Sequence, residues 1–145
     1  MTECKGETVM LEVEKLTVYF GSRCVLEDVS LSVKRGNVLG IVGESGSGKS
    51  VTSKAILGIL AGNSIIEGGE ILYDGKDLLS ITEDEMYKIR GDKISMIFQE
   101  PMTSLNPVMT VGDQIMEVIR LHDKKLSRKD AWIKACEMLE LVGIK

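Results

Sequence analysis

The segment from Gly43 to Ser50 constrains the fold more than any other part of the sequence. It reads GESGSGKS and satisfies the pattern G-x-x-x-x-G-K-S/T. Five of the 15 glycines lie between Gly36 and Gly48, where an even spread would place about one. An almost continuously apolar run, residues 38–42, precedes the segment and predicts a strand buried on both faces. The residues after it predict an amphipathic helix that ends near Gly62, with an apolar face formed by Val51, Ala55, Ile56, Ile59 and Leu60.

The chemistry of this pattern is phosphate binding. Glycine lets the backbone adopt conformations closed to other residues and approach a phosphate closely. The N–H groups of such a loop converge on the anion, and the N-terminus of the following helix reinforces them. Lys49 is placed to reach the β- and γ-phosphates of a nucleotide, and the Ser50 hydroxyl is placed to bind Mg²⁺. The alternative is a glycine-rich turn with an incidental lysine. The residues expected to contact nucleotide are Gly43, Glu44, Ser45, Gly46, Ser47, Gly48, Lys49, Ser50 and Val51.

Composition bounds the classes of protein that this chain can represent. Its 145 residues, 43% of them hydrophobic, suit one globular domain or part of a larger one. A net charge of −4 and an aromatic content of 4% argue against a nucleic-acid partner. The three cysteines, Cys4, Cys24 and Cys136, are widely spaced and form no CxxC pair, so we expect reduced thiols and no zinc site.

Membrane insertion is not expected from this sequence. Residues 1–14 carry charges throughout and contain no apolar core of a signal peptide. The longest apolar run, from Ala55 to Ala61, is far shorter than the roughly 20 residues that span a bilayer. Any membrane association is therefore expected to come through a partner protein.

The remaining chain divides into strands and then helices. Alternating apolar residues over 11–20 and 29–33 predict half-buried strands with turns at Gly21 and at 34–36, and residues 70–73 predict a short strand before an Asp74–Gly75 turn. Residues 82–85 match a capping box, so a short helix is expected to run to about Arg90. Residues 94–98 predict a second buried strand, and 101–107 predict a loop.

Two further helices are predicted after this loop. Thr110 and Ser127 are candidate N-cap residues. The apolar face of the first helix is expected to contain Val111, Ile115, Val118 and Ile119, and that of the second Ala131, Ala135, Leu139 and Val142. The only histidine, His122, is interpreted as a solvated residue near a helix end.

At this point the sequence resembles the ATP-binding subunits of ABC transporters. The glycine-rich loop follows about forty residues with three strand-like stretches, and the run ISMIFQEP (94–101) resembles the Q-loop of that family. The resemblance implies an α/β P-loop NTPase core with an N-terminal antiparallel β subdomain and the start of a helical subdomain. Residues 1–99 would form the first part, and residues 100–145 the Q-loop and first helices of the second, truncated part. The cofactors implied are ATP and Mg²⁺.

The resemblance also implies roles for two residues outside the loop. Phe20 matches the aromatic that stacks on adenine, with Tyr19 as second choice, although Phe20 can also be an ordinary core residue of a strand. Gln99 would contact Mg²⁺ or the attacking water and so act with Lys49 in catalysis. The alternative is a polar residue that merely ends a strand.

Two longer stretches narrow the resemblance to one branch of the family. Residues 43–60 and 98–115 are similar to the importers of dipeptides, oligopeptides and nickel, in which Val51 often follows the serine. Membrane permease subunits and a second, homologous ATPase subunit are the partners implied. The implied location is cytoplasmic, peripheral on the inner face of the cell membrane, with no membrane insertion and no nucleic-acid partner.

The sequence also departs from the family pattern. It contains neither an apolar strand ending in Asp-Glu after Gln99 nor an LSGGQ signature. We therefore expect the N-terminal part of a longer subunit, which binds nucleotide with negligible hydrolysis on its own. The alternatives are a non-catalytic nucleotide-binding module and another P-loop enzyme such as a small-molecule kinase. A kinase would need clustered arginines, whereas the five arginines here are dispersed.

Overall fold

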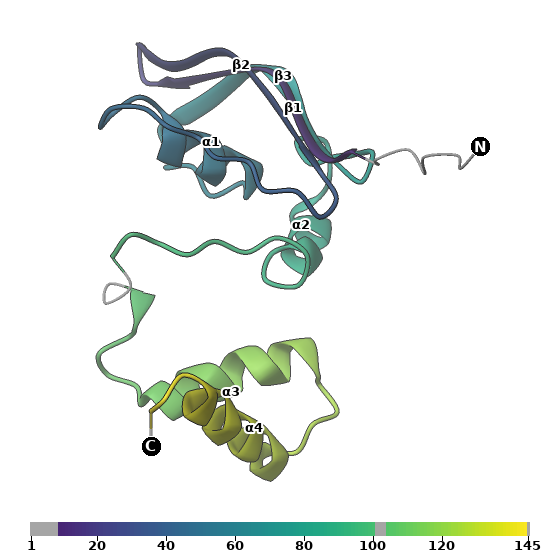
Figure 1. Ribbon diagram of the computed structural model, residues 1–145, viewed down its shortest axis with the longest axis vertical. Coiled ribbons are helices and arrows are strands. Elements are labelled where there is room, and N and C mark those ends of the chain that lie inside the picture. Colours follow the sequence, from purple (N-terminus) through teal and green to yellow (C-terminus); the bar gives the residue numbers. More distant parts are fainter. Residues whose placement is uncertain (1–8, 101–103, 145) are drawn as a thin grey trace, which may run out of the picture. The chain divides into compact units, whose positions relative to one another are not determined.

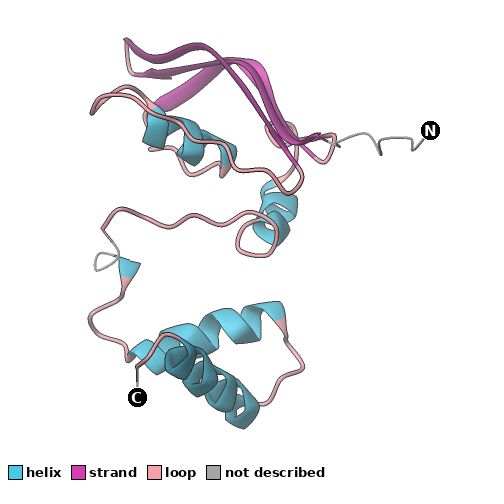
Figure 2. Cartoon of the chain, viewed as in Figure 1, coloured by secondary structure: helices cyan, strands magenta, loops and turns pink. Residues whose placement is uncertain are grey.

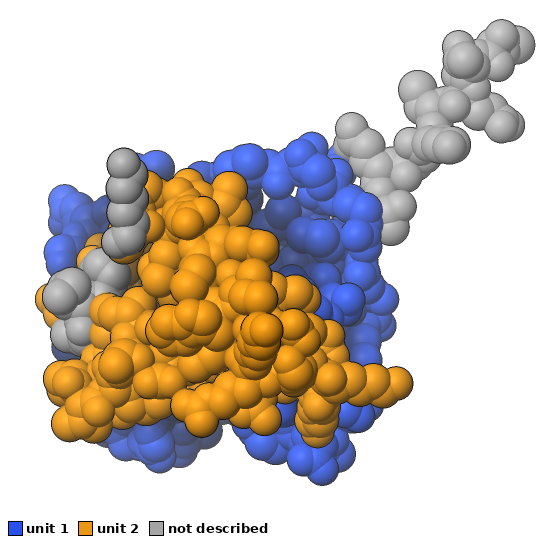
Figure 3. All heavy atoms as spheres, turned by 90° about the horizontal axis from the view of Figure 1, so that it is seen from below, with its two compact units in different colours: residues 1–95 blue, residues 96–145 orange. Residues whose placement is uncertain are grey.

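Two compact units make up the chain, residues 1–95 and residues 96–145, which Figure 3 draws in different colours. The computed structural model describes residues 9–100 and 104–144. Cys4, the charged stretch 1–8 and part of the predicted loop 101–107 lie outside these residues. The predicted division at residue 99 stays a prediction.

The first unit contains an antiparallel sheet with the strand order β2-β1-β3-β4 (Figures 1 and 2). Its strands are β1 (Val9–Phe20), β2 (Arg23–Lys34), β3 (Ser64–Tyr73) and β4 (Lys76–Asp77). β1 is central, with Leu16 opposite Val29 of β2 and Val13 opposite Ile71 of β3. The strands predicted over 11–20 and 29–33 are confirmed. However, β2 begins at Arg23, and an irregularity between Val13 and Leu16 interrupts the alternation of β1. The strand predicted at 70–73 is six residues longer at its start.

Helix α1 (Lys49–Ile56) covers one face of this sheet. Ala55 of α1 is buried together with Val13, Leu16 and Val18 of β1, each 1% exposed or less. The predicted helix is confirmed at its start, but it ends well before Gly62. Gly58 adopts a φ of +63°, and the left-handed conformation of a glycine stops a helix.

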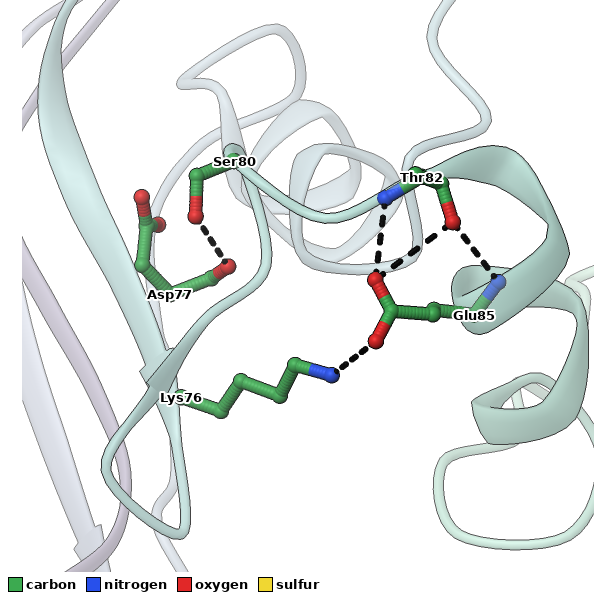
Figure 4. A network of polar contacts seen from close by, with 5 residues as sticks. All are labelled: Lys76, Asp77, Ser80, Thr82 and Glu85. Atoms are coloured by element: carbon green, nitrogen blue, oxygen red, sulfur yellow. Dashed lines mark hydrogen bonds and ion pairs between the residues drawn. The ribbon is translucent and has the colours of Figure 1, made fainter.

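Helix α2 (Glu83–Ile89) begins with the predicted capping box (Figure 4). The Glu85 N–H donates to the Thr82 hydroxyl, and the Thr82 N–H donates to the Glu85 carboxylate. Lys76 of β4 donates to the same carboxylate at 2.6 Å, so the cap also connects α2 to the sheet. The predicted turn at Asp74–Gly75 joins β3 to β4, and both of its residues have positive φ.

The prediction of buried strands at 38–42 and 94–98 is wrong. Neither segment forms a strand; Ile94 makes only an isolated bridge with Arg90. Val38, Val42 and Ile97 are each 97% exposed. A strand covered on both faces needs hydrogen-bonded neighbours and packed layers, and residues 9–100 and 104–144 supply none at these positions.

The second unit is an antiparallel pair of helices, α3 (Val111–His122) and α4 (Arg128–Leu141). Thr110 and Ser127 cap them as predicted, each accepting from a backbone N–H three residues on. The small Ala131 and Ala135 of α4 are buried against Met116 of α3. Met116 was not among the residues predicted for the apolar face of the first helix. The predicted face members Val111, Val118 and Val142 are exposed, because a helical pattern does not show which apolar stripe meets the neighbour.

Candidate functional site

The glycine-rich loop 43–48 joins the extended segment 37–42 to α1, in the first unit. Gly48 is the N-cap residue of α1, with a φ of +91°. A Cβ atom at this position would overlap Cδ2 of Leu26 from β2. Since a side chain is excluded both by this contact and by the left-handed backbone, the glycine fixes how closely the loop approaches the sheet.

Lys49 closes the loop on itself. Its ammonium donates to the carbonyl oxygens of Gly43 and Glu44, both at 2.6 Å, and to the Ser47 hydroxyl at 3.2 Å. An ammonium has three donors, so each one has an acceptor within the loop. The positive charge is therefore held within the loop by its own oxygen atoms.

The backbone donors of the loop are available for an anion. The Ser47 N–H donates to the Glu44 carbonyl at 3.2 Å and forms a turn. Among the described residues, the N–H groups of Gly46, Gly48, Lys49 and Ser50 have no acceptor. The first turn of α1 contains no acidic residue and no side-chain cap. Unpaired N–H groups at a helix N-terminus favour an anion, and phosphate is the usual one.

The Ser50 side chain is exposed on the first turn of α1. Its hydroxyl makes no hydrogen bond to the residues that the structure describes. Because a hydroxyl is a ligand that Mg²⁺ accepts beside phosphate oxygens, Ser50 fits the predicted metal role. No group of three or more His, Cys, Asp or Glu side chains within 9–100 and 104–144 could hold a metal.

Thr52 stabilises the end of the loop through hydrogen bonds to Gly48. The sequence analysis did not identify this residue. It is 4% exposed, and its hydroxyl donates to the Gly48 carbonyl at 3.1 Å, beside its own N–H at 2.9 Å. The two bonds fix the carbonyl at the point where loop becomes helix. A position three residues before Ala55 falls on the same helix face, and this spacing was the signal for its burial.

A hollow of about 440 Å³ lies beside the loop. Its walls come from β2, from the extended segment 39–43 and from the start of α1. They include apolar side chains such as Val29 and Leu31 together with Ser47, Lys49 and Thr52. A larger hollow of about 790 Å³ lies in the second unit around α3. The N-terminus of α3 in its wall is capped by Thr110 and carries Asp113 in its first turn, whereas α1 has neither feature. The loop is therefore the better candidate for a phosphate.

The predicted adenine-stacking residues lie at the end of β1. Phe20 is partly buried and packs against the hydrophobic core, as the core interpretation of this residue requires. Tyr19 points to the opposite face of the sheet, since side chains alternate along a strand. A side-chain hydrogen bond with Cys24, its cross-strand neighbour, raises the pKa of Tyr19 above its ordinary value. A stacking role for either ring stays a prediction.

Gln99 belongs to the second unit, where it is an exposed residue in a bend. Its predicted contact with Mg²⁺ or with the attacking water stays a prediction. His122 is exposed in the last turn of α3. Within the described residues, therefore, the structure brings together the loop residues 43–50, with Leu26 and Thr52 as supports.

Comparison with known proteins assigns this arrangement to a class. A sequence model of the family described as ABC transporter matches residues 26–145. The chain belongs to the ABC transporter family, and the resemblance identified from the loop and from the run at 94–101 is confirmed.

The chain is also similar in sequence to individual curated proteins of this family. The chain is 48% identical over 143 residues to the dipeptide transport ATP-binding protein DppD of Lactococcus lactis and 47% identical over 137 residues to the oligopeptide transport ATP-binding protein OppD of Escherichia coli. These matches cover 96% and 92% of this chain but only 41% and 40% of the relatives. The chain therefore spans about two fifths of the length of these relatives.

Solved structures agree with the predicted fold. The dimeric post-hydrolysis state of the ATP-binding cassette MJ0796 bound to ADP and Pi matches with a TM-score of 0.78 and 27% identity, over 94% of this chain and 58% of that one. A nucleotide-free ATP-binding cassette from an ABC transporter matches with a TM-score of 0.60 and 25% identity. The predicted ABC ATPase fold is confirmed. None of the described helices has the length and apolar character needed to cross a membrane.

Proposed function

We propose that the loop 43–50 binds the phosphates of Mg-ATP, and that this chain supplies the nucleotide-binding part of an ATP-driven importer for dipeptides or oligopeptides. The observation that carries the proposal is the geometry of the loop. The Lys49 ammonium donates to three oxygen atoms of the loop, and the N–H groups of Gly46, Gly48 and Ser50 have no acceptor among the described residues. Such a site attracts a polyphosphate and has no other evident ligand.

The residues of the loop fit the two cofactors. The N–H groups would bind the phosphate oxygens, and Lys49 would exchange one or more of its loop carbonyls for the β- and γ-phosphates. The Ser50 hydroxyl, which has no partner among the described residues, would bind Mg²⁺. When bound, Mg²⁺ neutralises phosphate charge. Phe20 would stack on adenine, and Gln99 would act on the γ-phosphate side of the site.

The transport role is proposed from the relatives. Those that match are described as dipeptide and oligopeptide transport ATP-binding proteins. We propose membrane permease subunits and a second, homologous ATPase subunit as partners, and a cytoplasmic position on the inner face of the membrane. Because the chain belongs to the ABC transporter family, a small-molecule kinase is no longer an alternative.

A second candidate function is nucleotide binding without turnover. The 145 residues contain no LSGGQ and no apolar strand ending in Asp-Glu. Hydrolysis of a phosphoanhydride needs several charge-stabilising and water-positioning groups together. The loop and Gln99 supply part of that set, so we expect this chain to bind Mg-ATP and to hydrolyse it negligibly.

Calorimetric titration of the 145-residue chain with Mg-ATP tests both candidates. Lys49→Ala is expected to abolish binding, because it removes the charge at the centre of the loop. Lys54→Ala is the matched control: it removes a lysine from the last turn of the same helix and is expected to keep the affinity. Unchanged affinity of the Lys49 variant would disprove the assignment of the loop. Rapid turnover of Mg-ATP by the unaltered chain would contradict the expectation that it binds nucleotide without hydrolysis.

A further inference from the structure

Outside the loop, the side chain of Arg90 makes four hydrogen bonds. Arg90 is the C-cap residue of α2, and its guanidinium reaches the far end of α1. Nε donates to the Leu57 carbonyl at 2.7 Å, and Nη2 donates to the Gly58 carbonyl at 3.2 Å. Nη1 donates to the Glu83 carboxylate at 2.5 Å. The Arg90 side chain is only 25% exposed, and its hydrogen bond to the Leu57 carbonyl is partly buried, whereas its partner Glu83 is 79% exposed.

The C-terminus of α1 is built around these contacts. The Gly58 N–H donates to the Ala55 carbonyl, and the Ile59 N–H donates to the Lys54 carbonyl, which is the usual hydrogen-bond pattern of a glycine-terminated helix. The carbonyls of Leu57 and Gly58 face outward from this turn, and Arg90 binds both. A positive charge at this end also complements the helix dipole.

The packing here leaves little room for adjustment. A Cβ atom on Gly58 would lie 3.0 Å from Arg90 Nη2. Glu83 holds the guanidinium from the other side through two hydrogen bonds, the second at 3.4 Å. The guanidinium therefore lies between the end of α1 and the start of α2, with hydrogen bonds to both.

Helix α1 transmits this restraint to the loop. It has eight residues, about two turns, and its first residue is Lys49. A short helix moves as one body, so a shift at Leu57 displaces the N–H groups at the other end. A small misplacement of a positioning group can cost a large factor in function.

We propose that Arg90 is a positioning residue of the nucleotide site, which fixes the orientation of α1 and thereby aims the loop N–H groups at the phosphates. The proposal rests on the proposed function of the loop. Arg90 also pairs through its backbone with Ile94, where the segment that leads to Gln99 begins. Arg90, whose side chain binds the end of α1, therefore lies at the beginning of the segment that leads to Gln99.

The test compares three variants of the 145-residue chain. Arg90→Gln removes the charge and the fork of donors. Arg90→Lys keeps the charge but cannot bind two carbonyls and a carboxylate in one plane. Lys76→Met is the control, since it removes another ion pair of α2, that with Glu85, without touching α1 (Figure 4). Affinities for Mg-ATP and for inorganic triphosphate are measured by calorimetry, with thermal midpoints alongside.

Arg90→Gln is expected to weaken the binding of both ligands by roughly tenfold, because the N–H groups of the loop are no longer held in position. The measurement is made at a temperature where the variant is folded. The affinities of the Arg90→Lys variant are expected to lie between those of the Arg90→Gln variant and those of the unaltered chain. Lys76→Met is expected to leave both affinities unchanged. In ¹⁵N spectra without ligand, the amide signals of Gly46 and Gly48 should move in the Arg90 variants only.

A lowered thermal midpoint with unchanged affinities and unmoved loop signals would show a merely structural role and overturn the proposal. If Arg90→Gln does not fold, Arg90→Lys decides by the same measurements. Failure of the unaltered chain to bind nucleotide would overturn the proposed function instead. The loop signals in ligand-free protein would then still show whether Arg90 positions α1.

Discussion

Gly48 at the start of α1 lies directly against Leu26 of β2, so that a Cβ on the glycine would overlap the leucine Cδ2. The contact connects the phosphate-binding loop to the sheet at the residue where loop becomes helix. Thr52 binds the Gly48 carbonyl from the other side. One close contact and two hydrogen bonds therefore hold Gly48 at the junction of loop and helix.

Gly48→Ala is expected to weaken Mg-ATP binding and to lower the thermal midpoint. A φ of +91° disfavours a side chain by about 1–3 kcal/mol, and relief of the overlap would shift the loop. Calorimetry and thermal unfolding measure the two effects. Gly62→Ala is the matched control, because Gly62 has open space around it and no positive φ; equal effects of the two substitutions would contradict this account.

Local sequence signals predicted features of both units. The cap at Thr82 and the strand β1 in the first unit, and the caps at Thr110 and Ser127 in the second, depend on neighbouring residues alone, and each is confirmed. The glycine-rich loop is local as well, since its conformation follows from glycines and a helix N-terminus. These features need no knowledge of the rest of the fold.

Features that depend on distant partners were wrong or missed. The apolar character of 38–42 and 94–98 indicates burial, but burial depends on neighbouring strands that residues 9–100 and 104–144 do not provide. The contact of Arg90 with Leu57 joins residues 33 apart in sequence, and no pattern within either segment predicts it. The support of Gly48 by Leu26 is of the same kind.

Acid is expected to destabilise the first unit through two carboxylates of α2. The hydrogen bond from Arg90 lowers the pKa of Glu83, and the hydrogen bond from Lys76, with that from the Thr82 backbone, lowers the pKa of Glu85. A pKa that is lower in the folded state gives stability above the unfolded value of about 4.3. This stability is lost as the pH falls through the folded pKa, so the thermal midpoint should fall below about pH 5.

A crossed pair of variants separates the two carboxylates. Carbon-13 titration should show that Lys76→Met raises the pKa of Glu85 toward its ordinary value and leaves that of Glu83 in place. Arg90→Gln should do the reverse, since each carboxylate has its own cation. If either substitution shifts both values equally, the two ion pairs do not act independently and the assignment of causes is wrong.

Phe20 provides the sharpest test of the adenine end of the site. Phe20→Leu keeps apolar bulk against the core while removing the ring, which limits the loss of stability. It is expected to weaken Mg-ATP by about 1–3 kcal/mol, the value of one aromatic–base stack, and to leave inorganic triphosphate binding unchanged. Tyr19→Leu, on the opposite face of the same strand end, is the matched control. Loss of ATP affinity in the Tyr19 variant alone would transfer the stacking role to Tyr19, and loss in neither would leave Phe20 as a core residue only.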